Sequence, residues 1–154
     1  MKPPRRLLAV ATAAFALFAF VACAGEERAP APLAEPLVDA IAEVKIAIEL
    51  RDIAFSEQVL RVATGQVVEL AITNSGTLRH DFTIERIPAQ VSASGRQRPD
   101  RFDVYLDLQR GQSGVLLLRV TEPGEYTFFC SVPGHRRAGM VGTLVVSGSA
   151  AGGG

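Results

Sequence analysis

Alternation of apolar and polar residues in short segments is the feature that most limits what this 154-residue chain can fold into. In VKIAIEL, Val44, Ile46, Ile48 and Leu50 recur at the two-residue period of a half-buried β-strand. Turn-forming residues such as Gly, Asn and Pro separate the segments of this kind. Seven to eight short strands and no convincing helix predict an all-β fold, a Greek-key β-sandwich. The other predicted strands are residues 59–63, 66–73, 81–86, 102–108, 113–121, 124–130 and 140–147.

The length allows one domain with one core, which we place at residues 44–147. Residues 88–101, PAQVSASGRQRPDR, are polar and are predicted to form a solvated loop between strands. A single helical turn is expected within residues 37–43, and residues 148–154 are expected to form a flexible Gly/Ala tail.

The N-terminus is typical of an export signal, predicted over residues 1–23. The basic MKPPRR precedes eighteen uncharged residues, LLAVATAAFALFAFVACA. Three outcomes are open: lipid attachment at Cys23, since FVAC resembles a lipobox, ordinary cleavage to a soluble form, or an uncleaved membrane helix. We therefore expect an exported domain, periplasmic or on the outer face of the cytoplasmic membrane. The Ala-, Pro- and Glu-rich residues 24–43 are either an extended tether or a remnant without a spacing role.

Net charge argues against nucleic acid as a partner. The chain has 16 Lys plus Arg and 16 Asp plus Glu, and loss of Lys2, Arg5 and Arg6 with the signal leaves 13 against 16, a net charge of −3. A nucleic-acid binder needs a concentrated basic face to neutralise phosphates.

Three soft-metal donors fall within eleven residues near the C-terminus, at the spacing C-x4-H-x4-M. Cys130, His135 and Met140 lie between two predicted strands, with the turn-forming pair Pro133-Gly134 between them. A thiolate, an imidazole and a thioether together suit copper better than zinc or magnesium. The segment therefore predicts a copper-binding loop.

His80 lies fifty residues upstream of Cys130 and reaches this loop only through the fold. In a sandwich, the start of one strand and the turn between two later strands can share one end, which would complete a trigonal set of two His and one Cys with Met140 as the weak axial ligand. Taken singly, each residue has a structural explanation: a buried thiol, a hydrogen-bonded strand residue, an exposed turn residue and a core methionine. Together, four residues of three sparse types at these positions favour the metal site.

Two stretches, HDFTIE and GEYTFFCSVPGHRRAGMVGTLVV, resemble the blue-copper cupredoxins, and closely those of the auracyanin and azurin branch. The resemblance covers residues 44–147. It implies one type 1 copper bound by His80, Cys130 and His135 with Met140 axial. It also implies a monomeric electron carrier, not an enzyme, that exchanges electrons with a redox protein such as a cytochrome or a membrane oxidoreductase complex.

One position departs from the family pattern, which often has Asn where this chain has Asp81. The carboxylate can still accept a hydrogen bond from the N–H of Ser131, but its charge should favour Cu(II) unless Arg79 or another cation offsets it. Arg136 and Arg137 border the expected contact surface around His135 and either steer an acidic or haem-edge partner or form a solvated turn.

Other copper proteins are less compatible with the sequence. A copper nitrite reductase needs further histidines for its catalytic copper, and this chain has two. A binuclear CuA site needs a second cysteine in the loop, and this loop contains only Cys130. The remaining alternative is a periplasmic copper carrier or storage protein that uses the same ligands.

Overall fold

The computed structural model describes residues 37, 41–94 and 101–148. The predicted signal segment at 1–23, residues 24–36 and 38–40 of the predicted tether, and the tail from residue 149 lie outside the described residues. Residues 41–43, part of the expected helical turn, are not helical. The described part of the chain contains no apolar helix of membrane-spanning length.

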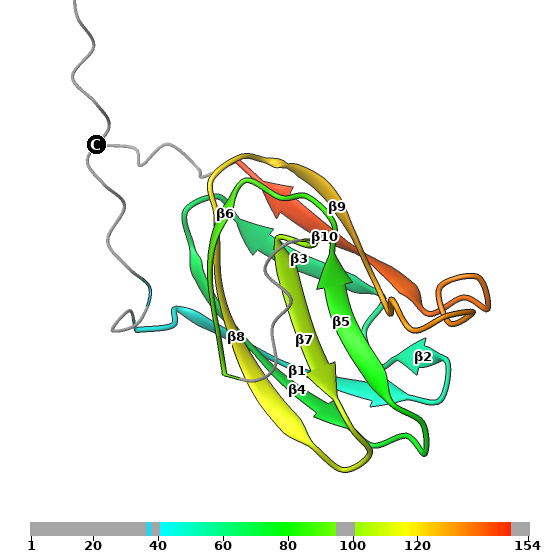
Figure 1. Cartoon of the computed structure of the whole chain (residues 1–154). Helices are drawn as coiled ribbons and strands as arrows, with labels where there is room; N and C mark the ends of the chain where they lie inside the picture. The colour runs from blue at the N-terminus through cyan, green and yellow to red at the C-terminus, as the bar shows by residue number, and fades with distance from the viewer. Residues whose placement is uncertain (1–36, 38–40, 95–100, 149–154) are drawn as a thin grey trace, which may run out of the picture. The chain divides into compact units, whose positions relative to one another are not determined.

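The described residues form ten β-strands in two five-stranded sheets (Figure 1). The predicted all-β fold is therefore confirmed, although the number of strands exceeds the seven to eight expected. The strands are β1 (Val44–Arg51), β2 (Ala54–Phe55), β3 (Val59–Ala63), β4 (Val67–Asn74), β5 (His80–Ile84), β6 (Ala89–Ser94), β7 (Val104–Leu108), β8 (Ser113–Val120), β9 (Gly124–Phe129) and β10 (Val141–Ser147).

The strand order is β2-β1-β4-β8-β6 in one sheet and β3-β10-β9-β5-β7 in the other. Two pairs, β1 with β4 and β3 with β10, are parallel, and the other pairs are antiparallel. From β2 to β9, each connection passes from one sheet to the other. This alternation gives the Greek-key sandwich that the sequence predicts.

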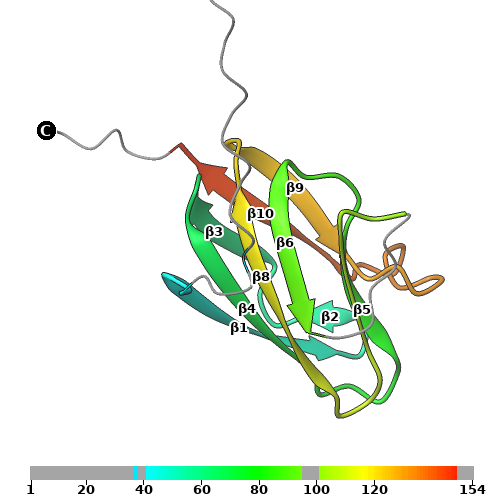
Figure 2. The ribbon, with the colours of Figure 1, turned by 60° about the vertical axis from the view of Figure 1, so that its left-hand side comes forward.

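Two strands were not predicted, and one of them corrects an expectation. Residues 88–101 were expected to be a solvated loop, but Ala89–Ser94 forms β6, which pairs with β8 along its whole length (Figure 2). Residues 95–100 of the expected loop lie outside the described residues. The half-buried Ala89, Val91 and Ala93 pack against the core, but two of these three residues are alanines, so the apolar side of the alternation is weak in the sequence. The other strand, β2, has only two residues, too few for any periodicity to show.

The core lies between the sheets and includes three phenylalanine rings in mutual contact. Phe82 of β5 and Phe128 of β9 stack with ring centroids 4.9 Å apart, and Phe55 of β2 meets both rings edge-on. All three side chains are buried. Aromatic pairs of this kind stabilise a fold beyond the area they bury, so the strands that carry the predicted ligands rest on a rigid base.

The connection between β9 and β10 projects from one end of the sandwich, beside β2 (Figure 1). Strand β5 begins at this same end, because its residue Thr83 pairs with Phe129, the last residue of β9. The fold therefore brings the start of β5 to the loop that follows β9.

Gly142 of β10 offers a test of the packing beneath this loop. A Cβ atom at this position would collide with the ring of Phe128 and would lie 2.7 Å from the backbone oxygen of Gln58. We expect Gly142→Ala to lower the free energy of unfolding by about 1–3 kcal/mol, since a filled core repacks poorly around an extra methyl group. Denaturant unfolding measures the change. Gly148→Ala is the control, because a Cβ there meets nothing within 4 Å, and equal stability of the two variants would contradict the prediction.

Candidate metal centre

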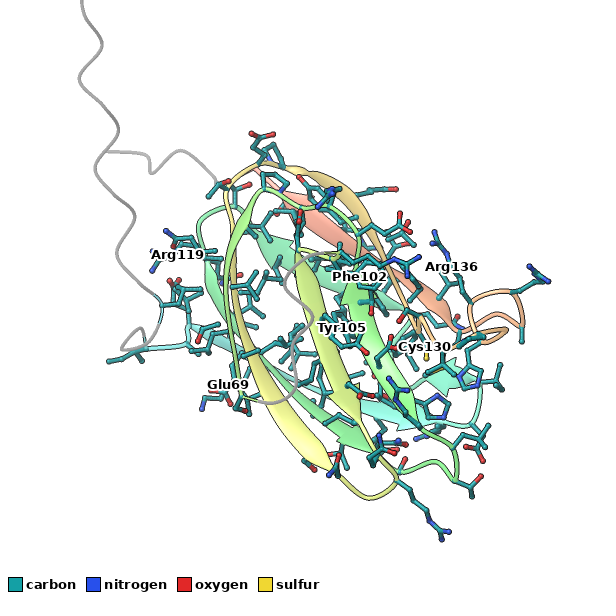
Figure 3. All side chains as sticks on the ribbon, viewed as in Figure 1. Glu69, Phe102, Tyr105, Arg119, Cys130 and Arg136 are labelled. Carbon is teal, nitrogen blue, oxygen red and sulfur yellow. The ribbon has the colours of Figure 1, made fainter. Side chains whose placement is uncertain are left out.

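The four predicted ligands meet at one end of the sandwich. His80 is the first residue of β5, Cys130 directly follows β9, His135 lies within the β9–β10 loop and Met140 directly precedes β10. His80, Cys130 and Met140 are fully buried, whereas His135 keeps 9% of its surface exposed. Figure 3 shows Cys130 where β9 runs into the loop.

Three donor atoms converge in the interior. Nδ1 of His135 lies 3.2 Å from Nδ1 of His80 and 3.4 Å from Sγ of Cys130, and the His80 Nδ1 to Cys130 Sγ distance is 3.9 Å. A trigonal metal ion with bonds of about 2.0 Å to nitrogen and 2.3 Å to sulfur would separate its donors by about 3.5 to 3.7 Å. The triangle thus has the size that one metal ion requires.

Met140 is fixed by backbone hydrogen bonds at the base of the loop. Its N–H donates to the carbonyl oxygen of His135 at 3.0 Å, and its own carbonyl accepts from the N–H of Cys130 at 3.1 Å. The side chain is fully buried in the same core cluster as Cys130. The structure thus places the backbone of Met140 against Cys130 and His135, and its role as axial ligand stays a prediction.

The loop keeps its shape through two glycines. Gly134 and Gly139 have φ angles of 90° and 104°, a left-handed region that favours glycine. Between them, the N–H of Ala138 donates to the carbonyl of Gly134 at 2.9 Å. This tight turn carries His135 back over Cys130, as Pro133-Gly134 in the sequence predicts.

Asp81 joins β5 to the loop through a buried carboxylate. It accepts hydrogen bonds from the backbone N–H of Ser131 at 2.6 Å, the Ser131 hydroxyl at 2.7 Å and the hydroxyl of Thr83 at 2.8 Å. The predicted bond from the Ser131 N–H is therefore confirmed. Arg79, the cation proposed to offset Asp81, instead pairs with Asp107 at 2.7 Å.

The environment of the donors shapes their protonation. Burial lowers the pKa of His80, so this imidazole is neutral and keeps a nitrogen lone pair for a metal. Burial also raises the pKa of the Cys130 thiol to about 11, although a hydrogen bond from the N–H of Asp81 to Sγ at 3.4 Å opposes this. Since a metal binds the thiolate, metal binding must release the Cys130 proton.

One polar neighbour of the site, Asp52, was not identified from the sequence. Oδ1 of Asp52, in the turn between β1 and β2, lies 3.5 Å from Nε2 of His80. Asp is common in turns, but nothing in the local pattern indicates a partner 28 residues away.

Comparison with known proteins agrees with this geometry. The chain matches the model of the cupredoxin-like domain family over residues 10–146. The chain belongs to the cupredoxin-like family. It is 27% identical to the copper-resistant cuproprotein CopI of Rubrivivax gelatinosus over 129 residues, which cover 77% of this chain and 75% of that protein. It is 29% identical to auracyanin-B of Chloroflexus aurantiacus over 112 residues, 62% of this chain and 48% of that protein, so this match spans about half of auracyanin-B.

A solved structure of auracyanin B supports the fold, with a TM-score of 0.57 and 21% identity over 71% of this chain and 93% of that one. The resemblance to blue-copper cupredoxins is therefore confirmed. Copper is confirmed as the cofactor, since the family is that of the cupredoxins and the cluster of two imidazoles and one thiol fits this metal.

The charge of Asp81 leads to a prediction about the redox potential of the bound copper. We expect Asp81→Asn to raise the midpoint potential of the copper-loaded chain by on the order of tens of millivolts, because it removes a buried negative charge beside Cys130 that favours Cu(II). Redox titration of the visible absorption measures the shift. Glu69→Gln is the matched control, since Glu69 lies on β4 of the other sheet, well away from Cys130 (Figure 3). An unchanged or lower potential in Asp81→Asn would count against this role of Asp81.

Proposed function

We propose that this chain is a single-electron carrier that binds one type 1 copper ion through His80, Cys130 and His135, with Met140 as the axial ligand. The observation that carries the proposal is the buried cluster of three donors, whose ligand atoms all lie within 4.8 Å of one another. Bound copper supplies the one-electron Cu(II)/Cu(I) couple, and two imidazoles with a thiolate and a weak thioether suit both oxidation states.

The chain's own part in this function is to hold the donors still and to exclude water. His80 and Cys130 are fully buried, and two hydrogen bonds fix the segments that carry them: Asp81 donates its N–H to Sγ of Cys130 and accepts the N–H of Ser131. Donors held in this way need little rearrangement when an electron arrives or leaves. No covalent bond is made or broken, so the function needs no acid or base.

His135 is the donor nearest to solvent and marks the route for electrons. It keeps 9% of its surface exposed, and its neighbours Pro133, Ala138 and Gly139 are exposed residues that are small or apolar. Such a surface allows close approach of a partner, and the exposed Arg136 and Arg137 border it. We place the electron-exchange contact here.

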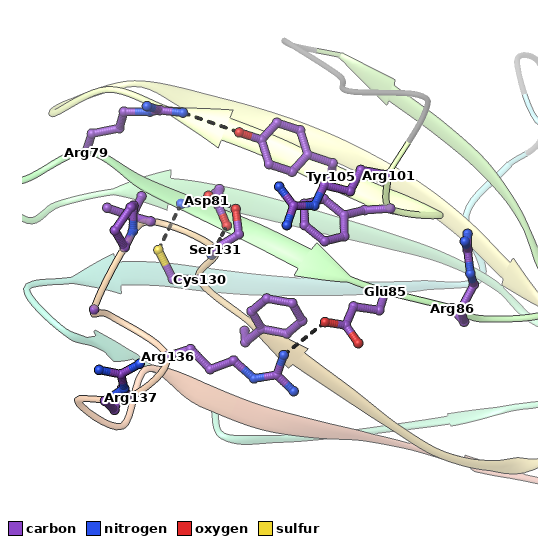
Figure 4. A pocket seen from close by; sticks show the side chains of 15 residues that line it. Arg79, Asp81, Glu85, Arg86, Arg101, Tyr105, Cys130, Ser131, Arg136 and Arg137 are labelled. Atoms are coloured by element: carbon purple, nitrogen blue, oxygen red, sulfur yellow. Dashed lines mark hydrogen bonds and ion pairs between the residues drawn. The ribbon is translucent and has the colours of Figure 1, made fainter.

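A hollow of about 860 Å³ beside the site supports an acidic partner (Figure 4). Cys130 and Phe129 lie on its wall, and the guanidinium of Arg136 covers the Phe129 ring at 3.9 Å while it bonds Glu85 at 3.0 Å. Asp81 and Glu85 are the acidic residues of the lining. Complementary charge mainly accelerates encounter between partners. The five arginines of the lining are Arg79, Arg86, Arg101, Arg136 and Arg137.

Copper carriage or storage is the second candidate function. The relative from Rubrivivax gelatinosus, a copper-resistant cuproprotein, supports it. The same four ligands would serve, but the protein would then pass copper to an acceptor. Repeated redox cycling without metal loss supports electron transfer, whereas handover of copper to a copper-free acceptor supports carriage.

Export and tethering complete the proposal. The charge-free run that ends near Cys23 supports export, followed by attachment to the outer face of the membrane through a lipid on Cys23 or through the uncleaved segment. Mass spectrometry of the mature N-terminus distinguishes a lipidated Cys23 from an intact or differently cleaved chain.

The central test is the spectrum of the copper-loaded chain. We expect an intense visible absorption from charge transfer between thiolate and Cu(II), with the EPR signature of a type 1 site. Cys130→Ser should abolish this band, because the hydroxyl cannot replace the thiolate sulfur. A wild-type chain that binds copper without the band, or a variant that keeps it, would contradict the proposed site.

The arginines beside His135 provide a test of steering. We expect Arg136→Glu/Arg137→Glu to slow reduction by ferrocyanide several-fold at low salt and to accelerate reduction by a cationic cobalt(II) complex, since the local potential changes sign. Stopped-flow kinetics at low and high salt measure both rates, and the differences should shrink as salt screens the charges.

Arg61→Glu/Arg119→Glu is the control with the same change in net charge. Arg61 lies on β3 and Arg119 on β8, and neither lines the hollow. Rates in Arg136→Glu/Arg137→Glu that match the wild type at low salt would dismiss the steering role.

A further inference from the structure

Asp52 contacts the back of the first predicted ligand. Its side chain is 44% exposed, whereas His80 is fully buried, and its Oδ1 lies 3.5 Å from Nε2 of His80. The other ring nitrogen of His80, Nδ1, faces His135 and Cys130. His80 therefore lies between a carboxylate on one side and the candidate metal centre on the other.

The carboxylate of Asp52 is held in place by the loop that leads into β5. Its Oδ1 accepts the backbone N–H groups of Thr77 at 2.7 Å and Leu78 at 3.2 Å, and its Oδ2 accepts the Thr77 hydroxyl at 2.7 Å. All three of these groups donate to Asp52, as suits an ionised carboxylate, and they hold it in one position. Asp52 is thus a fixed negative charge.

The turn that presents Asp52 is strained. Ile53 has a φ of 63° and is the only non-glycine residue with a positive φ in the described part of the chain. Branching at Cβ makes this conformation unfavourable, and such outliers concentrate at functional sites. Ile53 nevertheless packs against the core, and the flanking pairs Leu50 with Phe55 and Arg51 with Ala54 close the turn. The hairpin therefore holds Asp52 towards His80 despite this strain.

Space between Asp52 and His80 depends on a glycine. A Cβ atom at Gly76 would lie 2.6 Å from Oδ1 of Asp52 and 3.1 Å from Nε2 of His80. The side chain of Asn74 fixes the same loop, because its Oδ1 accepts the N–H of Gly76 at 3.0 Å and its Nδ2 donates to the carbonyl of Leu78 at 2.8 Å. Two chain segments are therefore shaped around this one contact.

We propose that Asp52 is a positioning residue for the metal centre: it accepts the Nε2–H of His80 and thereby leaves the lone pair on Nδ1 for the metal. A carboxylate behind a ligand imidazole fixes its tautomer and orientation and makes it a stronger donor. The fixed charge also stabilises the more positive oxidation state. The proposal rests on the proposed copper site and adds a fifth side chain to it.

Three variants separate the hydrogen bond from the charge. Asp52→Asn keeps an oxygen acceptor but loses the charge, and Asp52→Ala loses both. Gly76→Ala keeps Asp52 and pushes it away from His80. Since Asp52 also holds the backbone of Thr77 and Leu78, Gly76→Ala tests the contact even if Asp52→Ala fails to fold. Glu69→Gln on β4 is the control for the loss of one distant negative charge.

Nitrogen-15 NMR of the copper-free, full-length chain reads the tautomer of His80 without any copper chemistry. We expect the proton on Nε2 in the wild type and in Asp52→Asn, and a mixture of tautomers in Asp52→Ala and Gly76→Ala. Wild-type protonation on Nδ1, or an unchanged Nε2–H tautomer in both Asp52→Ala and Gly76→Ala, would overturn the proposal.

Redox titration of the copper-loaded chain measures the effect of the Asp52 charge on the midpoint potential. We expect Asp52→Asn to reduce the preference for Cu(II) over Cu(I) about tenfold. For one electron this is a rise in the midpoint potential of about 59 mV. A shift no larger than that of Glu69→Gln would overturn the electrostatic part. Absence of the type 1 absorption in the wild type would instead overturn the proposed function and leave the NMR result to decide on Asp52.

Discussion

The buried carboxylate of Asp81 is the interaction on which the geometry of this site depends. It bonds both the backbone and the hydroxyl of Ser131, fifty residues away in the chain. Because His80 precedes Asp81 and Cys130 precedes Ser131, this tie fixes two donors relative to each other. The bond from the N–H of Asp81 to Sγ of Cys130 adds a second constraint. The donors thus converge through the protein's own hydrogen bonds, and a metal ion would meet a framework already in place.

The sandwich supplies the rigidity behind this tie. Pairing of β5 with β9 continues from Thr83 and Phe129 to Ile84 and Phe128, and the stacked rings of Phe82 and Phe128 lie under it. A movement of either donor would disturb packed core residues, which resist small displacements. In the proposed carrier, such stiffness keeps the geometry between the preferences of Cu(II) and Cu(I) and so limits rearrangement on electron transfer.

Sequence predicted the parts of this architecture that are visible as local patterns. Alternation located eight of the ten strands, and the rarity of Cys, His and Met picked out the four residues that meet at the loop. Prediction from sequence failed where the pattern is weak. Small residues such as Ala89 and Ala93 hide β6, and β2 has only two residues, too few to show a period. Asp52 was missed for another reason, since its contact with His80 depends on the strained turn at Ile53 and on the missing side chain of Gly76. Such contacts arise from tertiary geometry and leave no periodic signal.

Charges of opposite sign are placed at different depths around the site. The carboxylate of Asp81 is buried and accepts hydrogen bonds from the loop, whereas Arg136 and Arg137 are exposed on the outside. Salt screens exposed charges strongly and buried ones weakly. In the proposed carrier, the buried carboxylate of Asp81 therefore influences the balance between the oxidation states, and the outer arginines set the rate at which an acidic partner arrives. One charge acts on the redox equilibrium of the copper and the others act on the rate of encounter. A substitution can therefore change the redox potential without changing the encounter rate, or the reverse.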